Sequence, residues 1–139
     1  MSRADRFTQT DKKNQIYSDF LTDLNPHPVS GDIVRYVNET AVIRSIKNII
    51  LTDRGERLYQ PAIGSSIKSM LFEPMSQGIA DIMSNVIRDA ISNYEPRAKV
   101  LSVSIDPDYE SHRYTVTISI MVINREDPVT FNVSLTRVR

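Results

Sequence analysis

The spacing of hydrophobic residues changes along the chain, from a helical period in the middle to a strand period near the end. Between about residues 39 and 94, apolar residues recur every three or four positions, as they do on the buried face of a helix. From about residue 101 onward they alternate with polar residues, as they do in a strand with one buried face. Helices followed by strands indicate an α+β domain in which helices pack on a sheet.

A first helix is predicted from about Glu39 to Asp53. Asn38 precedes it and is a good N-cap residue, and Gly55 follows it and readily adopts the left-handed conformation that commonly ends a helix. The apolar stripe of this helix consists of Val42, Ile43, Ile46, Ile49 and Ile50. A short helix is predicted at Ser66–Phe72, with three residues facing inward: Ile67, Met70 and Leu71.

A second long helix is predicted from Ser76, its N-cap, to about Tyr94. It stops there because Pro96 disfavours a helical conformation at the residue before it. Its apolar stripe consists of Ile79, Ile82, Met83, Val86, Ile87, Ala90, Ile91 and Tyr94. We expect the helix to pack on the sheet through three residues of this stripe: Ile82, Val86 and Ile91.

The last third of the chain predicts three strands joined by two turns. The turns are expected at residues 106–108 and 124–128, where Asp, Asn and Pro are concentrated. The inward-facing residues are expected to be Leu101, Val103 and Ile105 in the first strand, Tyr114, Val116, Ile118, Ile120 and Val122 in the second, and Val129, Phe131, Val133 and Leu135 in the third. The predicted fold class is therefore α+β, with two main helices packed on a three-stranded antiparallel β-meander.

Residues 1–32 are predicted to form an N-terminal arm, partly flexible, ahead of a domain at residues 33–139. Hydrophobic residues at positions 16, 17, 20, 21 and 24 have a helix-like spacing over a short span, after which Pro26 and Pro28 forbid a continuing helix. The polar composition of the arm favours a mobile tail, whereas its scattered aromatic residues favour a segment that lies on a neighbouring protein. Both interpretations remain open at this point.

The composition limits the classes of partner. The 139 residues fit one domain, and a hydrophobic content of 40% is enough for a real core. Lys+Arg and Asp+Glu number 17 each, so the chain has no overall positive field for nucleic acid. It also lacks a signal-peptide pattern and an apolar run of the roughly 20 residues needed to span a membrane. We expect a soluble protein that is not exported and has neither nucleic-acid nor membrane partners.

Residues suited to catalysis or metal binding are sparse. There is no cysteine, and the two histidines, His27 and His112, stand alone in loop-like stretches, so we predict no metal site and no cofactor. No phosphate-binding or nucleophile motif is present. Glycoside hydrolysis needs only two carboxylates, and the candidates are Asp53, Glu56, Glu73 and Glu95. Solvated charges or ion pairs are the favoured explanation for them, because a catalytic acid needs a cleft that shifts its pKa. We therefore predict no catalytic residue.

The segment Tyr94–Arg97 forms a corner at the end of the long helix. Pro96 is expected to hold Glu95 in an extended conformation, and Arg97 to complement the partial negative charge of the helix end. One hypothesis is a helix stop with a local ion pair, since most surface ion pairs contribute little energy. The other is a rigid charged hook in which Glu95 and Arg97 both project toward a partner.

Three segments together resemble one protein family. They are Arg44–Arg57, which reads RSIKNIILTDRGER, Leu71–Met75, which reads LFEPM, and Asn93–Arg97, which reads NYEPR. Their order and spacing, followed by the three strands, resemble the baseplate wedge or sheath-initiator proteins of contractile phage tails and the related baseplate subunit of type VI secretion systems. The resemblance covers about residues 34–139 and leaves the stretch up to Gly31 outside.

This resemblance implies a structural role in a tail baseplate. It implies a sheath-like handshake domain at residues 33–139 that contacts other baseplate wedge proteins at their core bundle, the first ring of tail sheath protein and a tube-proximal hub. It implies several copies around the baseplate of a virion that is assembled in the host bacterial cytoplasm. The family's partner-binding signature falls on Glu95, Pro96 and Arg97. The other residues predicted to contact partners are Arg44, Lys47, Arg54, Glu56, Arg57 and Glu73.

The last strand is the predicted contact for the sheath. In a simple meander it lies at an edge, so its unpaired backbone groups can accept a strand from another chain. The residues assigned to this edge strand are Val129, Phe131, Val133 and Leu135. Two alternatives remain open: a peptidoglycan hydrolase, as a historical lysozyme label for some family members suggests, and an oligomeric adaptor unrelated to tails.

Overall fold

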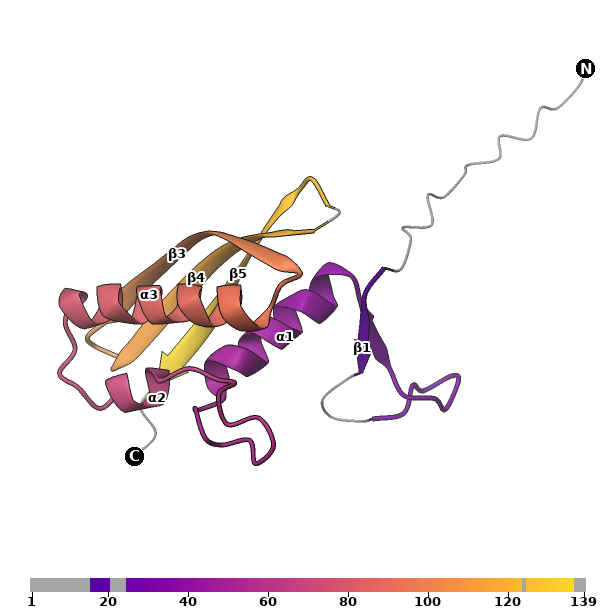
Figure 1. The fold of residues 1–139 in the computed structure, drawn as a ribbon, viewed down its shortest axis with the longest axis horizontal. Helices are drawn as coiled ribbons and strands as arrows, with labels where there is room; N and C mark the ends of the chain where they lie inside the picture. Colours follow the sequence, from indigo (N-terminus) through magenta and orange to yellow (C-terminus); the bar gives the residue numbers. More distant parts are fainter. Residues whose placement is uncertain (1–15, 21–24, 124, 137–139) are drawn as a thin grey trace, which may run out of the picture.

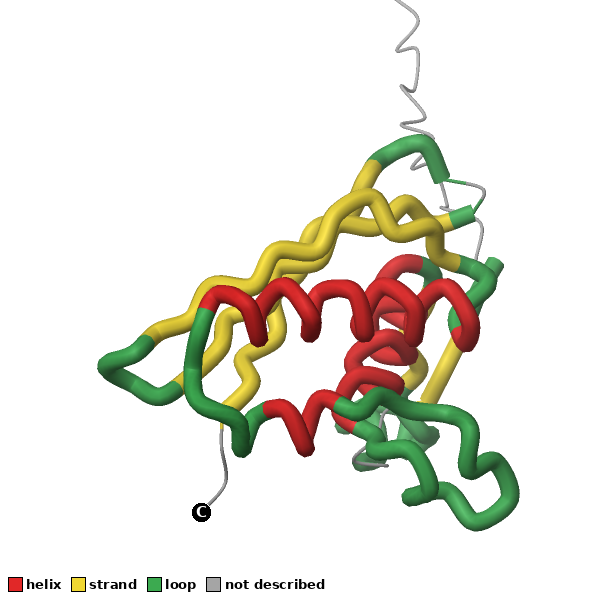
Figure 2. Tube along the Cα trace, turned by 60° about the vertical axis from the view of Figure 1, so that its left-hand side comes forward, coloured by secondary structure: helices red, strands yellow, loops and turns green. Residues whose placement is uncertain are grey.

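The computed structural model describes residues 16–20, 25–123 and 125–136, and it confirms the predicted α+β fold (Figure 1). The elements in chain order are β1 (Ser18–Phe20), β2 (Arg35–Val37), α1 (Glu39–Leu51), α2 (Ile67–Met70), α3 (Gln77–Tyr94), β3 (Ala98–Asp108), β4 (Arg113–Val122) and β5 (Pro128–Thr136). Strands β3, β4 and β5 form an antiparallel meander in that order. The helices α1 and α3 lie on one face of this sheet (Figures 1 and 2). No helix among the described residues is long and apolar enough to cross a membrane.

The central strand β4 contributes more buried side chains to the core than β3 or β5 does. Every second residue faces the helices, as predicted, and the five inward residues are at most 2% exposed: Tyr114, Val116, Ile118, Ile120 and Val122. On the opposite face, the Ser119 and Thr130 hydroxyl oxygens hydrogen-bond across β4 and β5 at 2.8 Å. The sheet therefore has one apolar face covered by helices and one face rich in hydroxyl groups.

Strand β3 departs from the predicted alternation at two places. A β-bulge lies between Val100 and Ser102, so Leu101 is 45% exposed instead of facing inward. The turn expected at residues 106–108 is also wrong, because β3 continues to Asp108 and the chain reverses at residues 109–112. The Asp108 carboxylate accepts hydrogen bonds from two backbone N–H groups of that turn. Pro107 is tolerated in β3 because this is an edge strand.

Helix α3 begins and ends where the sequence predicts. The Ser76 hydroxyl accepts a hydrogen bond from the backbone N–H of Ile79 at 3.3 Å, and the helix ends at Tyr94. Its buried residues are Ala80, Met83, Ile87, Ala90 and Ile91. Of the three residues expected to contact the sheet, Ile91 is buried and Val86 half-buried, but Ile82 is 52% exposed. That part of the prediction is wrong because Ile82 is turned about 100° around the helix axis from its buried neighbour Met83.

Helix α1 packs on α3 and the sheet through an apolar face similar to the predicted one. Its buried residues are Ala41, Val42, Ile46, Ile49 and Ile50, whereas Ile43 is only half-buried. The helix ends at Leu51, two residues before the predicted end. Thr52 has an extended backbone and its hydroxyl donates to the carbonyl of Asn48 at 2.6 Å. Gly55 does have a positive φ of 87°, but it lies in the turn beyond the helix.

The N-terminal arm contributes a strand instead of the helix that its spacing suggested. Residues 18–20 pair with β2 in an antiparallel ladder, so the helical prediction is wrong there. Residues 21–24, which belonged to the same predicted stripe, lie outside the described residues. The division at residue 32 stays a prediction, although β1 pairs with a strand from the other side of it.

Candidate partner-docking sites

The corner at the end of α3 is closed by an ion pair. Glu95 is only 2% exposed, and its two carboxylate oxygens accept hydrogen bonds from Arg97 Nε at 2.6 Å and Arg97 Nη2 at 2.8 Å. The expected projection of Glu95 into solvent is therefore wrong, because its carboxylate turns inward to a bidentate partner two residues away. Pro96 is exposed between them, and about a third of the Arg97 side chain reaches solvent.

Both members of this pair are held in their charged forms. Burial raises the pKa of Glu95, but hydrogen bonds from Arg97 and from Ser45 on α1 outweigh that effect and place the pKa below its ordinary value. The hydrogen bond to Glu95 raises the pKa of Arg97. Because Ser45 lies on α1, the buried carboxylate also ties the end of α3 to the neighbouring helix.

The same corner holds the N-terminal arm. The guanidinium carbon of Arg97 lies 5.4 Å from the centre of the Tyr17 ring, within the range of a cation–π contact. Asn38 adds two backbone-directed contacts, because its Oδ1 accepts from the N–H of Ile16 at 2.9 Å and its own N–H donates to the carbonyl of Tyr17 at 2.7 Å. Asn38 occupies the predicted N-cap position, but its side chain makes no capping bond and binds the arm instead.

Acidification is expected to weaken this corner. The folded-state pKa of Glu95 is lowered, so its contribution to stability is present above the unfolded pKa, near 4.5, and is lost as the pH falls through the folded pKa. We expect the thermal midpoint to fall as the pH is lowered below about 4.5, and the Glu95→Gln variant to lose less over that interval than the wild type. Circular dichroism melts of both proteins between pH 3 and 7 measure this. Parallel pH profiles for the two proteins would contradict the assignment to Glu95.

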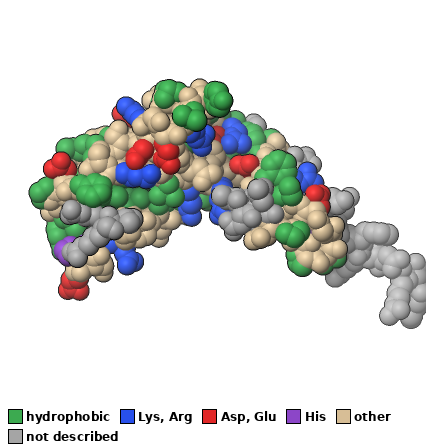
Figure 3. Space-filling model, turned by 90° about the horizontal axis from the view of Figure 1, so that it is seen from below, with side chains coloured by type: hydrophobic (Ala, Val, Ile, Leu, Met, Phe, Trp, Pro, Cys, Tyr) green, Lys and Arg blue, Asp and Glu red, His purple; other side chains and the backbone are tan. Residues whose placement is uncertain are grey.

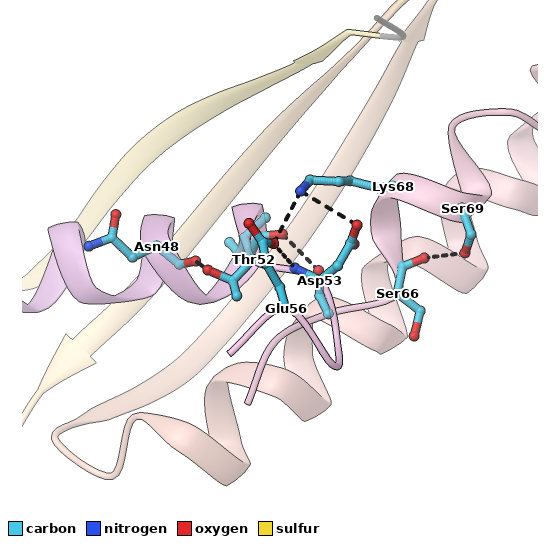
Figure 4. A network of polar contacts seen from close by, with 9 residues as sticks. Asn48, Thr52, Asp53, Glu56, Ser66, Lys68 and Ser69 are labelled. Carbon is cyan, nitrogen blue, oxygen red and sulfur yellow. Dashed lines mark hydrogen bonds and ion pairs between the residues drawn. The ribbon is translucent and has the colours of Figure 1, made fainter. Parts of the chain in front are cut away.

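A second cluster of predicted residues lies in the loop after α1, and Lys68 is its centre (Figure 4). The Lys68 ammonium lies 3.5 Å from Asp53 Oδ2 and 3.3 Å from Glu56 Oε2. Glu56 also accepts a hydrogen bond from the backbone N–H of Asp53 at 2.9 Å, and that bond is the main cause of its lowered pKa. The two carboxylates are therefore held around a shared cation, as ion pairs and not as a catalytic pair.

The remaining predicted contact residues are spread over other surfaces. Arg44 lies over the Tyr36 ring of β2 at 5.0 Å, and Lys47 lies over the Phe131 ring of β5 at 5.7 Å. Arg54 and Arg57 are exposed in the loop after α1. Glu73 is exposed beside an open cavity of about 580 Å³ between the segment after α2 and the turn that joins β3 to β4. The predicted residues thus form several contact points and not a single site.

The predicted edge strand is an edge within the described residues. Strand β5 pairs with β4 on one side only. The four residues assigned to it, Val129, Phe131, Val133 and Leu135, face the core, with the last two buried. A second chain that pairs with this strand would therefore contact its backbone and its outward side chains, not these four.

Sequence reasoning missed several residues that build these sites. Tyr17, Ser45 and Lys68 complete the corner and the loop cluster, yet they are isolated in the sequence and share no motif with their partners. The one usable signal is Asn38, because an asparagine before a helix readily hydrogen-bonds nearby backbone groups through its side chain. These contacts depend on how distant segments meet, which local patterns do not specify.

Taken together, the fold and its contact points define a class of protein: a small α+β domain in which the described residues leave one strand edge open and close one helix end with an ion pair. The family model of the baseplate wedge protein gp25 matches residues 37–128. Baseplate wedge protein gp25 of Enterobacteria phage T4 is 34% identical over 120 residues, which are 84% of this chain and 87% of that protein. The chain belongs to the baseplate wedge protein gp25 family, and the resemblance seen in its sequence is confirmed.

Solved structures share the fold. A protein described as a tail lysozyme of Geobacter sulfurreducens has a TM-score of 0.67 and 24% identity, with 73% of this chain and 92% of that chain covered. A chain of the baseplate of the anti-feeding prophage has a TM-score of 0.68 and 24% identity, with 80% and 89% covered. At this level of identity the likeness establishes the fold alone.

Proposed function

We propose that this chain is a structural baseplate wedge subunit that docks on the core wedge bundle and starts sheath assembly. Family membership supports the baseplate role, and the open edge of β5 is the observation that carries the sheath role. On this proposal the protein acts in the tail baseplate, where it is present in several copies. The baseplate is assembled in the host bacterial cytoplasm. Its partners are other wedge proteins, the first sheath ring and a tube-proximal hub.

The two edges of the sheet differ in their readiness to pair. Strand β3 carries a bulge at Leu101 and a proline at position 107, and both features discourage addition of a further strand. Strand β5 pairs with β4 in continuous register and has a proline only at its first residue. Its nine residues offer a longer unobstructed edge, which supports β5 as the strand that accepts a sheath segment.

The corner is proposed to dock the core bundle through Arg97 and Pro96. Glu95 is buried, so its part is to fix the direction of the Arg97 guanidinium. Holding one side of the guanidinium in a bidentate pair lowers the entropy lost when its exposed part binds a partner.

The carboxylates of the described residues favour a non-enzymatic role over that of a peptidoglycan hydrolase. A glycosidase needs one carboxyl group whose pKa is raised enough to hold a proton near neutral pH. The pKa values of Glu56 and Glu95 are instead lowered by hydrogen-bond donors. The Lys68 ammonium, 3.3 Å from Glu56 Oε2, further stabilises the charged form of that carboxylate.

Placing lysines on the outer face of β5 is expected to block sheath initiation. Asn132 and Ser134 are exposed, and lysine on an edge strand is a common device against strand addition. We expect baseplates that carry Asn132→Lys with Ser134→Lys to form sheath at a rate reduced about tenfold or more, as counted by electron microscopy of polymerising sheath protein.

The matched control lies directly opposite on β4. Thr117 and Thr115 pair with Asn132 and Ser134, share their face of the sheet and belong to a strand whose edges are both occupied. Thr115→Lys with Thr117→Lys adds the same charge without changing the free edge, so sheath formation is expected to persist. If the two double variants reduced sheath formation equally, the cause would be the added positive charge on this face of the sheet, and β5 would not be the strand that accepts a sheath segment.

A further inference from the structure

Two adjacent hydrophobic side chains stand almost fully in solvent at the tip of the loop between α1 and α2. Leu58 is 91% exposed and Tyr59 is 97% exposed, more than any other large hydrophobic residue among those described. Figure 1 shows this loop projecting from the body of the domain below α1. Exposed apolar groups that gather at one projecting point mark interaction sites more often than scattered ones do.

The loop is braced on both sides of its tip. The Gly55 N–H donates to the carbonyl of Pro61 at 2.8 Å, which closes the neck of the loop. The Tyr94 hydroxyl on α3 donates to the carbonyl of Ala62 at 2.5 Å. The buried Ser65 hydroxyl donates to the carbonyl of Ile50 at 2.7 Å. These bonds fix the two ends of the loop to α1 and α3.

Gly64 shows how closely the returning segment packs. A Cβ atom at this position would lie 2.6 Å from the carbonyl oxygen of Thr52, and φ is 135°, so only glycine fits. Together with the Lys68 cluster at the start of the loop, this packing holds the projecting tip in one position. A pre-organised tip loses little conformational entropy when it binds.

The charges around the tip are of both signs, and the two carboxylates, those of Asp53 and Glu56, are paired with Lys68. Glu56 is engaged by Lys68, whereas neither Arg54 nor Arg57 takes part in the ion pairs of the described residues, and both are exposed. The view from below, the side on which the loop projects, shows hydrophobic side chains with both basic and acidic side chains beside them (Figure 3). A binding surface for this tip would therefore be apolar at its centre and acidic at its rim.

We propose that Leu58 and Tyr59 insert into an apolar, acid-rimmed pocket on a neighbouring baseplate protein, with Arg54 and Arg57 pairing the carboxylates of the rim. This rests on the proposed baseplate role and adds a docking point distinct from the Arg97 corner and from β5. Tyrosine and arginine are the residue types that most often dominate binding energy at interfaces. A membrane is a poorer partner because two apolar side chains on a short loop offer much less buried area than an amphipathic helix. A second copy of the tip is disfavoured because it would bring the exposed Arg54 and Arg57 of both copies together.

The test is Leu58→Ser with Tyr59→Ser in the full chain, measured as the affinity for co-expressed, purified core wedge bundle. We expect the dissociation constant to rise about 30-fold or more, with an unchanged thermal midpoint because both side chains are exposed. Arg54→Glu with Arg57→Glu is expected to weaken binding and to remove much of its salt dependence. The matched control is Ile82→Ser, which removes an exposed hydrophobic side chain from α3 and should bind as the wild type does.

Several outcomes would overturn the proposal. Wild-type affinity of the serine variant would show that the tip is not a docking point. Tip-dependent self-association of the isolated chain in sedimentation, or tip-dependent binding to phosphatidylglycerol vesicles, would assign the tip to another occupant. If the serine variant binds normally while the β5 lysine variant fails to form sheath, only the tip proposal falls. If the wild type does not bind the wedge bundle at all, the docking role falls with it.

Discussion

Replacing Arg97 with alanine is expected to lower the free energy of unfolding by about 3 kcal/mol, far more than the loss of an ordinary surface arginine. The reason is that Arg97 is the bidentate partner of a carboxylate that is 2% exposed. Without it Glu95 must stay charged with Ser45 as its remaining side-chain donor, take up a proton or move out to water. The estimate is at the low end for buried pairs because a third of the Arg97 side chain is already solvated.

Urea or thermal unfolding of the variant measures this loss. Arg88→Ala is the matched control, because Arg88 is exposed on α3, the helix that the Glu95–Arg97 pair follows, and it is expected to change stability by less than about 0.5 kcal/mol. A loss as small as that for Arg97→Ala would mean that the pair does not form in solution.

A double replacement separates the structural part of Arg97 from its docking part. Exchanging both members of a buried pair for apolar residues of similar size is often nearly neutral for stability. Glu95→Met with Arg97→Met is therefore expected to regain most of the stability lost in Arg97→Ala. If Arg97 docks the core bundle, the double variant folds yet binds the bundle tens-fold more weakly. A folded double variant that binds normally would reduce the corner to a structural brace for α1, α3 and the arm.

The contrast between α3 and β3 shows why some elements could be predicted and others not. Helix α3 is specified by its own residues: a serine that caps it, an apolar stripe and a proline that stops it. Strand β3 is not specified by its own residues in this way. The bulge at Leu101 depends on how β4 lies beside it, whereas strict alternation of polar and apolar residues predicts that Leu101 faces inward. The helical prediction for the N-terminal arm is wrong for the same reason. Three of its residues pair with a distant strand, and this pairing overrides a weak local helical spacing.

The sites divide in a similar way. The resemblance picked out Glu95 and Arg97, and the local ion pair was one of the two hypotheses for them. That Glu95 is buried could not be read from its neighbours, because Ser45 comes from fifty residues earlier and Tyr17 from the N-terminal arm. The exposed tip at Leu58 and Tyr59 was also out of reach, since a sequence records hydrophobicity and not whether the loop folds back onto the core.

Ile87→Ala is expected to destabilise the domain by about 3–4 kcal/mol, because it empties a fully buried position at the centre of the α3 stripe. Ile82→Ala, five residues earlier on the same helix, removes the same atoms from a side chain that is 52% exposed, and we expect a loss below about 1 kcal/mol. Both changes raise helix propensity by a similar small amount, so the difference between them isolates burial. Unfolding midpoints in urea at constant slope measure it. Equal losses for the two variants would mean that α3 is rotated about its axis from the position described, and would place Ile82 against the sheet after all.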